Sequence, residues 1–121
     1  MKKIIKAYFD CWLQKDDSRL NEFFSDDAVY IECYGPEYVG KAQIIRWFRD
    51  WNKIGTVLQW DITDFIEQGS KICVEWNFKY IYDGNTDEFN GVTIAEFDRN
   101  NQICNLREFE SKSKHYNPYE E

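Results

Sequence analysis

The residue of clearest chemical interest in the sequence is Glu32, near the end of a β-forming run from Ala28 to Cys33. Tyr30 and Tyr34 flank it, and this segment contains no lysine or arginine. A carboxylate that loses water without gaining a cation is disfavoured in its charged form, so its pKa rises toward the range useful for proton transfer. Glu32 is therefore a candidate acid or base. The alternative is a strand-end carboxylate that only accepts a hydrogen bond from Tyr8.

Aromatic residues are unusually abundant, at 18% of the 121 residues, with five Trp, eight Tyr and nine Phe. So many large rings rarely pack without gaps or polar partners, which favours a concave, ring-lined cavity for a small hydrophobic or aromatic ligand. The period-two run from 71 to 82 places its rings on one face of a strand. That face comprises Ile72, Val74, Trp76, Phe78, Tyr80 and Tyr82. The rings would then form sheet core, with a pocket only where the core is left unfilled.

Charge and cysteine usage argue against several classes of protein. The net charge is −7, and the fifteen Lys and Arg residues form no stripe, so no nucleic acid partner is expected. The first residues are too polar for a signal peptide or a membrane span, and we expect a cytoplasmic protein. The four cysteines are widely spaced and there is one His, so we expect neither a metal or other cofactor nor a disulfide framework. Buried thiols are expected at Cys11, Cys33, Cys73 and Cys104.

The order of elements predicts a single α+β domain over residues 1–121, with 113–121 as a C-terminal tail. Helical stripes are expected at 3–14, over a shorter segment ending at 24, and from 40–41 through Trp47 and Trp51. Strands are expected at 28–33 and in four longer runs at 56–67, 71–82, 86–97 and 103–112. The segment 34–37 between the first strand and the third helix reads as a turn.

This order resembles the nuclear-transport-factor-2-like superfamily, a cystatin-like cone, and in particular its SnoaL-like and ketosteroid-isomerase-like members. Two motifs carry the resemblance, Phe-Phe-Ser-Asp-Asp-Ala-Val at 23–29 and Gly-Lys-Ala-Gln-Ile at 40–44. It implies three N-terminal helices packed on a strongly curved antiparallel sheet, around one pocket. The superfamily includes isomerases, dehydratases, epoxide hydrolases, polyketide cyclases and non-catalytic carriers, so the fold alone does not define the chemistry.

Similarity to the ketosteroid isomerases implies roles for individual residues. Those enzymes place an oxyanion-holding tyrosine twenty residues before the motif alanine, which matches Tyr8 and Ala28. Their aspartate base stands four residues after that alanine, which matches Glu32. Their buried acid on a late strand corresponds to Thr93, a weaker hydrogen-bond donor, so the resemblance does not extend to steroid isomerase activity.

The resemblance also implies that Leu106 and Glu108 point toward the pocket, so Glu108 is expected to face Glu32. Two carboxyls in an apolar pocket cannot both ionise cheaply, so one is held protonated as an acid while the other acts as a base. This suits proton transfer beside a carbonyl, and the alternative is an ion pair of Glu108 with Arg107 or Arg46. The expected ligand contacts are Tyr34, Trp47, Trp51, Trp76, Phe78, Tyr80, Thr93 and Leu106.

Three functions remain open from the sequence. The first is a lyase, isomerase or cyclase that uses Glu32, Tyr8 and Glu108 on a hydrophobic cyclic substrate. The second is a non-catalytic binder of a small hydrophobic ligand, and the third is a protein-interaction module. Unpaired polar groups in the pocket would favour the enzyme, an apolar lining the binder, and a large exposed apolar patch the interaction module.

We expect a homodimer, because the superfamily usually pairs through the outer face of its sheet. The face that carries Cys73, Glu75 and Asn77 is also too mixed in character to be plain solvent surface. Sedimentation at micromolar concentration should therefore give the mass of two chains. A mass of one chain under those conditions would contradict the expectation.

Overall fold

Helices precede the long strands in the chain, which confirms the predicted α+β class. The computed structural model describes residues 1–112 and 114–120. The helices are α1 (Lys2–Gln14), α2 (Leu20–Phe23) and α3 (Lys41–Ile54). The strands are β1 (Phe24–Ile31), β2 (Glu37–Val39), β3 (Gly55–Gln68), β4 (Lys71–Tyr82), β5 (Asn85–Phe97) and β6 (Ile103–Lys112). Of the helices in this described part, none has both the length and the apolar character needed to span a membrane.

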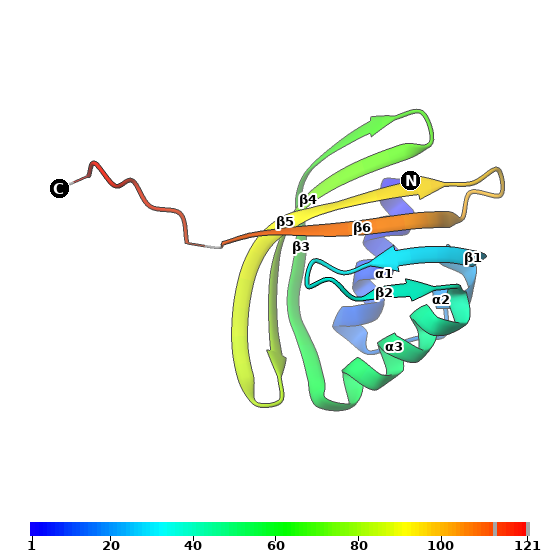
Figure 1. Ribbon diagram of the computed structural model, residues 1–121, viewed down its shortest axis with the longest axis horizontal. Helices are drawn as coiled ribbons and strands as arrows, with labels where there is room; N and C mark the ends of the chain where they lie inside the picture. The colour runs from blue at the N-terminus through cyan, green and yellow to red at the C-terminus, as the bar shows by residue number, and fades with distance from the viewer. Residues whose placement is uncertain (113, 121) are drawn as a thin grey trace.

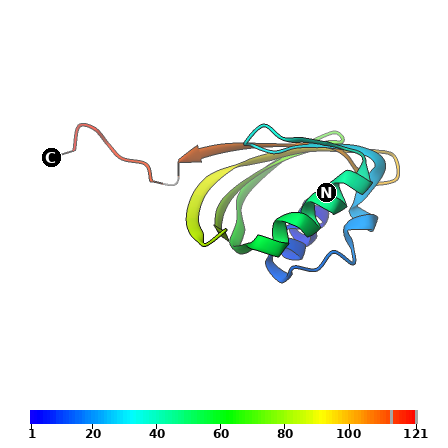
Figure 2. The same cartoon turned by 60° about the horizontal axis from the view of Figure 1, so that its bottom comes forward.

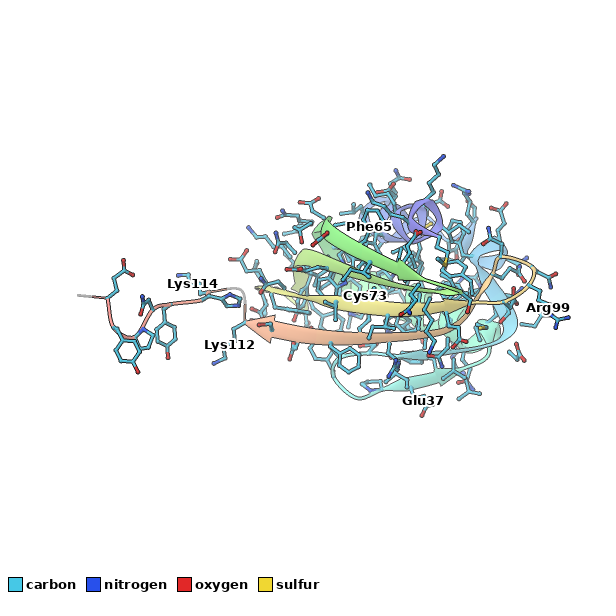
Figure 3. All side chains as sticks on the ribbon, turned by 90° about the horizontal axis from the view of Figure 1, so that it is seen from above. Glu37, Phe65, Cys73, Arg99, Lys112 and Lys114 are labelled. Atoms are coloured by element: carbon cyan, nitrogen blue, oxygen red, sulfur yellow. The ribbon has the colours of Figure 1, made fainter. Side chains whose placement is uncertain are left out.

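All six strands form one sheet, in the order β2-β1-β6-β5-β4-β3. The four long strands make an antiparallel meander, as predicted, but β1 pairs with β6 in parallel. The sheet is therefore mixed, and the prediction of a purely antiparallel sheet is wrong at this one ladder. Figure 1 shows β1 and β2 beside β6, and in Figure 3 Glu37 and Phe65 mark the β2 and β3 edges of the sheet.

The sheet curves around α1 and α3, which lie on its inner side (Figure 2). Two register shifts in β3, between Val57 and Gln59 and between Ile62 and Asp64, interrupt its pairing with β4. Such bulges bend a strand and increase its twist. The inner face of the sheet therefore becomes concave and encloses space between itself and the helices.

Burial along β4 shows where the inner face is filled and where it stays open. The even-numbered residues point inward, as their period predicts, and Ile72, Val74 and Trp76 are fully buried. Farther along the strand, Phe78 and Tyr80 are only half-buried. Between these two parts α1 packs on the sheet, where Phe9 stacks on Trp60, the β3 partner of Phe78, with ring centroids 3.8 Å apart. One end of the cone is thus solid core, and the other is ring-lined and accessible.

The segment between α1 and α3 differs most from the sequence-based expectation. The predicted second helix is a single turn, because Phe24 already pairs with Ile103 as the first residue of β1. The predicted turn at 34–37 ends one residue early, because Glu37 already begins the short strand β2, in which Tyr38 pairs with Tyr30. Three residues are too few to show a period, which is why the sequence gives no signal for β2.

The termini and cysteines complete the comparison. Residues 114–120 extend away from the domain beyond β6, where Lys112 and Lys114 mark the passage into the tail (Figure 3). Residues 113 and 121 of the predicted tail lie outside the described residues. All four cysteines are free thiols, but only Cys11 is buried, so the expectation of burial is wrong for Cys33, Cys73 and Cys104, which are half-buried.

At Gly91 of β5, the backbone of β6 and the Trp76 ring come so close that a larger residue would not fit. A β-carbon at this position would collide with the backbone oxygen of Phe109 and lie 2.8 Å from the Trp76 ring. We therefore expect Gly91→Ala to lower the free energy of unfolding by roughly 1–3 kcal/mol in urea denaturation, the usual cost of overpacking. Where the methyl group fits, Gly→Ala instead raises the free energy of unfolding by about 0.4–1 kcal/mol, because it restricts the unfolded chain. Unchanged or increased stability would show that the sheet has room here.

Candidate active site

The accessible end of the cone holds a cavity of about 610 Å³. Of its eighteen lining residues twelve are aromatic, and they include all five tryptophans of the chain. A cavity of this size and character is typical of small-molecule sites. The aromatic lining consists of Trp12, Tyr30, Tyr34, Tyr38, Trp47, Trp51, Trp60, Trp76, Phe78, Tyr80, Tyr82 and Phe89. The other lining residues are Glu32, Cys33, Pro36, Asp50, Ile54 and Glu108.

Most residues predicted to contact a ligand do line this cavity. They are Glu32, Tyr34, Trp47, Trp51, Trp76, Phe78, Tyr80 and Glu108. The apolar stripe of α3 contributes both to the core and to the cavity wall. Its residues Ile44 and Phe48 are buried in the core, whereas Trp47 and Trp51 are half-buried and form cavity wall.

Tyr8, Thr93 and Leu106 are fully buried and do not line the cavity. The expected ligand contacts at Thr93 and Leu106 are therefore corrected. Thr93 accepts a hydrogen bond from Nε1 of Trp76 at 2.9 Å, so its hydroxyl fixes a wall ring from behind. Leu106 pairs with Tyr30 in the parallel ladder and belongs to the same buried core.

Glu108 is the end point of a hydrogen-bonded chain that begins on α1. The hydroxyl of Tyr8 donates to that of Tyr30 at 2.8 Å, and Tyr30 donates to Oε2 of Glu108 at 2.7 Å. The pKa of Glu108 is raised to about 8, mainly by burial and also by the charge of Glu32, against the lowering effect of the Tyr30 bond. Glu108 is therefore mostly protonated at neutral pH. Tyr8 reaches it only through Tyr30, which sequence reasoning did not single out.

The alternative of an ion pair at Glu108 is not what the structure contains. Among the residues described, no lysine or arginine nitrogen lies within 4.0 Å of Glu108 or Glu32. Arg46 instead approaches Asp50 at 3.9 Å, and the guanidinium of Arg107 lies 5.8 Å from the centre of the Phe109 ring. The carboxyl of Glu108 thus has a tyrosine as its only protein donor in this part of the chain.

Glu32 lies beside Glu108 because each residue directly follows the last pair of the parallel β1–β6 ladder. Tyr30 pairs with Leu106 and Ile31 with Arg107, so the next step in the same register brings Glu32 alongside Glu108. Its partner is Tyr38 rather than the expected Tyr8, and the Tyr38 hydroxyl donates to Oε1 at 2.7 Å. Burial raises the pKa of Glu32, and the Tyr38 bond opposes that rise. The two carboxyls therefore share one apolar environment but have separate tyrosine donors.

Of the two missed tyrosines, one had a signal in the sequence. Tyr30 precedes Glu32 by two residues in the strand predicted at 28–33, so both were expected to point to the same side and Tyr30 should have been included. Tyr38 could not be placed, because its strand β2 gives no periodic signal. Its ring also stacks on Trp47, with centroids 4.6 Å apart and planes 15° from parallel, so β2 brings both a donor and a wall.

The remaining reactive group in the cavity is Cys33. Burial, followed by the charges of Glu108, Glu110 and Glu32, raises the pKa of its thiol to about 12. A thiol with such a pKa stays protonated at neutral pH and is a poor nucleophile. The carboxyls of Glu32 and Glu108 are thus stronger candidates for acid–base chemistry than this thiol is for nucleophilic chemistry.

Comparison with known proteins agrees with this geometry. The family model of the SnoaL-like domain matches residues 5–106. No curated protein matches the sequence. An LEH-like epoxide hydrolase from M. tuberculosis superposes with a TM-score of 0.80 at 16% identity, over 90% of this chain and 80% of that one. A candidate polyketide cyclase from Pseudomonas putida gives 0.76 at 16% identity, over 95% and 90%.

A third similar structure is a protein with a ketosteroid isomerase-like fold from Catenulispora acidiphila, in complex with trimethylamine. Its TM-score is 0.74 at 18% identity, over 88% of this chain and 83% of that chain. The chain therefore has the cone-shaped fold of the nuclear-transport-factor-2-like superfamily. Within that superfamily, the chain belongs to the SnoaL-like domain family.

The raised pKa of Glu108 predicts a pH-dependent stability. The folded chain holds this proton up to about pH 8, whereas the unfolded chain releases it near 4.5, so the free energy of unfolding falls as pH rises between those values. Glu108→Gln should remove much of this fall and be roughly 1–3 kcal/mol more stable than the parent above pH 8. Urea denaturation from pH 5 to 9 measures both effects. The control is Glu67→Gln at an exposed position on β3 outside the cavity, and equal pH profiles for all three proteins would contradict the prediction.

Proposed function

We propose that this protein is an enzyme that transfers a proton at a carbon next to a carbonyl, in a hydrophobic cyclic substrate. Such a step belongs to isomerase, lyase and cyclase reactions. The observation that carries the proposal is the pair Glu32 and Glu108, two neighbouring carboxyls in a ring-lined cavity. Each accepts one tyrosine hydrogen bond, and neither has a cationic partner among the described residues.

The pKa values of the two carboxyls are raised to different extents, so we assign them different roles. Burial raises the pKa of Glu108 to about 8, and it raises that of Glu32 by a smaller amount. Glu108 is therefore the acid at neutral pH and Glu32 the base. Pairs of titratable groups with separated pKa values are the usual basis of such assignments.

The proposed step moves one proton and leaves the carboxyl pair unchanged at the end. Glu32 removes a proton from the carbon beside the carbonyl, and an enolate oxygen develops. Because Tyr30 occupies Oε2 of Glu108, the acidic proton lies on Oε1 and donates a hydrogen bond to that oxygen. Glu32 then returns its proton to carbon, either at the original position or at a conjugated one.

Tyr8 is a positioning residue in this proposal. Its hydroxyl, fully buried behind Tyr30, orients the Tyr30 hydroxyl toward Glu108. This differs from the direct oxyanion contact that the resemblance to ketosteroid isomerases implies for Tyr8. The donor closest to the substrate is then the carboxylic acid of Glu108.

The similar structures support a small-molecule site without defining its chemistry. They comprise an epoxide hydrolase, a candidate polyketide cyclase and a complex with trimethylamine. At identities below 20% they support only the fold, so the reaction is argued from this chain's own residues. A non-catalytic binder is the second candidate, and the twelve cavity rings favour it.

We also propose that two copies pair through the outer face of the sheet. Ile66, Cys73 and Ile94 lie side by side on this face, and Val92 pairs with Phe109. Ile66 is 70% exposed and Phe109 47% exposed. A second copy would cover these apolar side chains, which lie on the side of the sheet opposite the cavity.

Hydrogen exchange at carbon tests the proton-transfer proposal without knowledge of the natural substrate. The protein is incubated with 2-tetralone, a bicyclic aromatic ketone, in deuterated water, and deuterium at the carbons beside the carbonyl is followed by NMR. We expect exchange above the buffer rate and a loss of about 100-fold or more in Glu32→Gln, the usual effect of removing a general base. Folding of the variant is checked by circular dichroism, since Gln should be tolerated there.

Glu67→Gln removes a carboxylate of the same kind outside the cavity and should exchange as the parent does. Equal exchange in Glu32→Gln and the parent would contradict the role of Glu32. Binding of 2-tetralone with no exchange above buffer would favour the non-catalytic binder.

A further inference from the structure

The cavity is lined by carboxyl groups but by no basic side chain. Its eighteen lining residues include the acids Glu32, Asp50 and Glu108, and they include no lysine, arginine or histidine. A low-dielectric cavity with carboxylates and no basic group is unfavourable for phosphate or carboxylate ligands. A neutral ligand would cover the rings but leave the charge of the site unbalanced.

The outer part of the cavity combines this charge with a cluster of rings. Trp51 lies 5.3 Å from Tyr82 and 6.1 Å from Tyr80 between ring centroids. Asp50 precedes Trp51 on α3 and lines the same cavity. All three rings are half-buried, whereas Asp50 and the nearby Ile54 are exposed, which places the cluster near the opening.

The last backbone carbonyl groups of α3 already have donors within the chain. The helix ends at Ile54, so its last carbonyl groups are at the same end of the cavity as Trp51. Lys15 donates to the carbonyl of Asn52 at 3.2 Å, and the backbone N–H of Asp83 donates to that of Ile54 at 3.0 Å, so the attraction for a ligand cation rests on the rings and carboxyls of the cavity. Arg46 and Lys53 approach Asp50 at 3.9 and 3.5 Å, but neither of them lines the cavity.

From these features we infer that the ligand carries an organic cation, a tertiary or quaternary ammonium group, which binds at the cluster of Asp50, Trp51, Tyr80 and Tyr82. Aromatic rings attract such cations through their quadrupoles, with tryptophan the strongest, and a carboxylate nearby supplies the opposite charge. The apolar body of the ligand would extend inward along Phe78 and Trp76. The inference rests on the proposed function, since it names a ligand class for the same cavity.

In this arrangement the cation and the reacting carbon occupy different parts of the cavity. The ammonium group contacts the outer cluster, and the carbonyl lies between Glu32 and Glu108. The cation then fixes the orientation of the substrate without neutralising the base. A substrate of this class is an amino ketone or a related carbonyl compound with a bulky ammonium substituent.

Binding of two isosteric probes to the whole protein tests the inference. Phenyltrimethylammonium and tert-butylbenzene have nearly the same shape and differ in charge because carbon replaces nitrogen. Affinities are measured by tryptophan fluorescence, since all five tryptophans line the cavity, at 0.15 M salt, where the screening length is about 8 Å. We expect the cation to bind at least tenfold more tightly than the neutral probe.

Two variants with a matched control locate the cation. Asp50→Asn and Trp51→Leu should each weaken binding of the cation by about threefold to tenfold and change the affinity for tert-butylbenzene by less than twofold. Glu67→Gln removes one negative charge away from the cavity and should leave both affinities unchanged, which controls for the overall charge of −7.

Equal affinity of the parent protein for the two probes would overturn the inference, as would absence of saturable binding of the cation. Losses in Asp50→Asn that are as large for the neutral probe would also overturn it. None of these outcomes bears on Glu32 as a base, because proton exchange is measured on a neutral ketone. Conversely, a failure to observe proton exchange would not affect the conclusion drawn from the binding of the two probes.

Discussion

Two half-buried carboxyls beside each other among aromatic rings form the constraint on which the site depends. Glu32 and Glu108 each have a tyrosine donor at 2.7 Å, and no cation among the described residues balances them. Removing charge from water without a counter-ion is costly, so the fold favours the protonated form of at least one carboxyl. A proton held near neutral pH is the property that makes this cavity suitable for acid–base chemistry.

The remainder of the fold holds these groups in place. Parallel pairing of β1 and β6 sets Glu32 beside Glu108, and β2 brings Tyr38 over the first of them. On β5, Thr93 lies directly across from Glu108 and fixes the Trp76 ring through a 2.9 Å hydrogen bond. The resemblance to the ketosteroid isomerases implies an acid at the position of Thr93, and in this chain the residue across from Thr93 on the neighbouring strand is Glu108.

Regular elements were predictable from the sequence, and short connections were not. The period-two pattern located β4 at 71–82 and the other long strands within one residue, because one face of each packs against helices and rings. Glu32 was singled out from its residue type and strand position, and Glu108 from the family resemblance, and both line the cavity. Tyr38 was missed because β2 has three residues, and the Tyr8–Tyr30–Glu108 chain was missed because parallel pairing of β1 with β6 depends on tertiary contacts far apart in sequence.

The central claim is that Glu108 is a neutral acid in the folded protein at neutral pH. Infrared spectroscopy in deuterated water tests it directly, because a protonated carboxylic acid has a carbonyl band separate from those of carboxylates and amides. The account predicts one such band at pH 7 that disappears as the pH rises through about 8 and that is absent from Glu108→Gln. A spectrum without this band at pH 7, or with an unchanged band in Glu108→Gln, would contradict it.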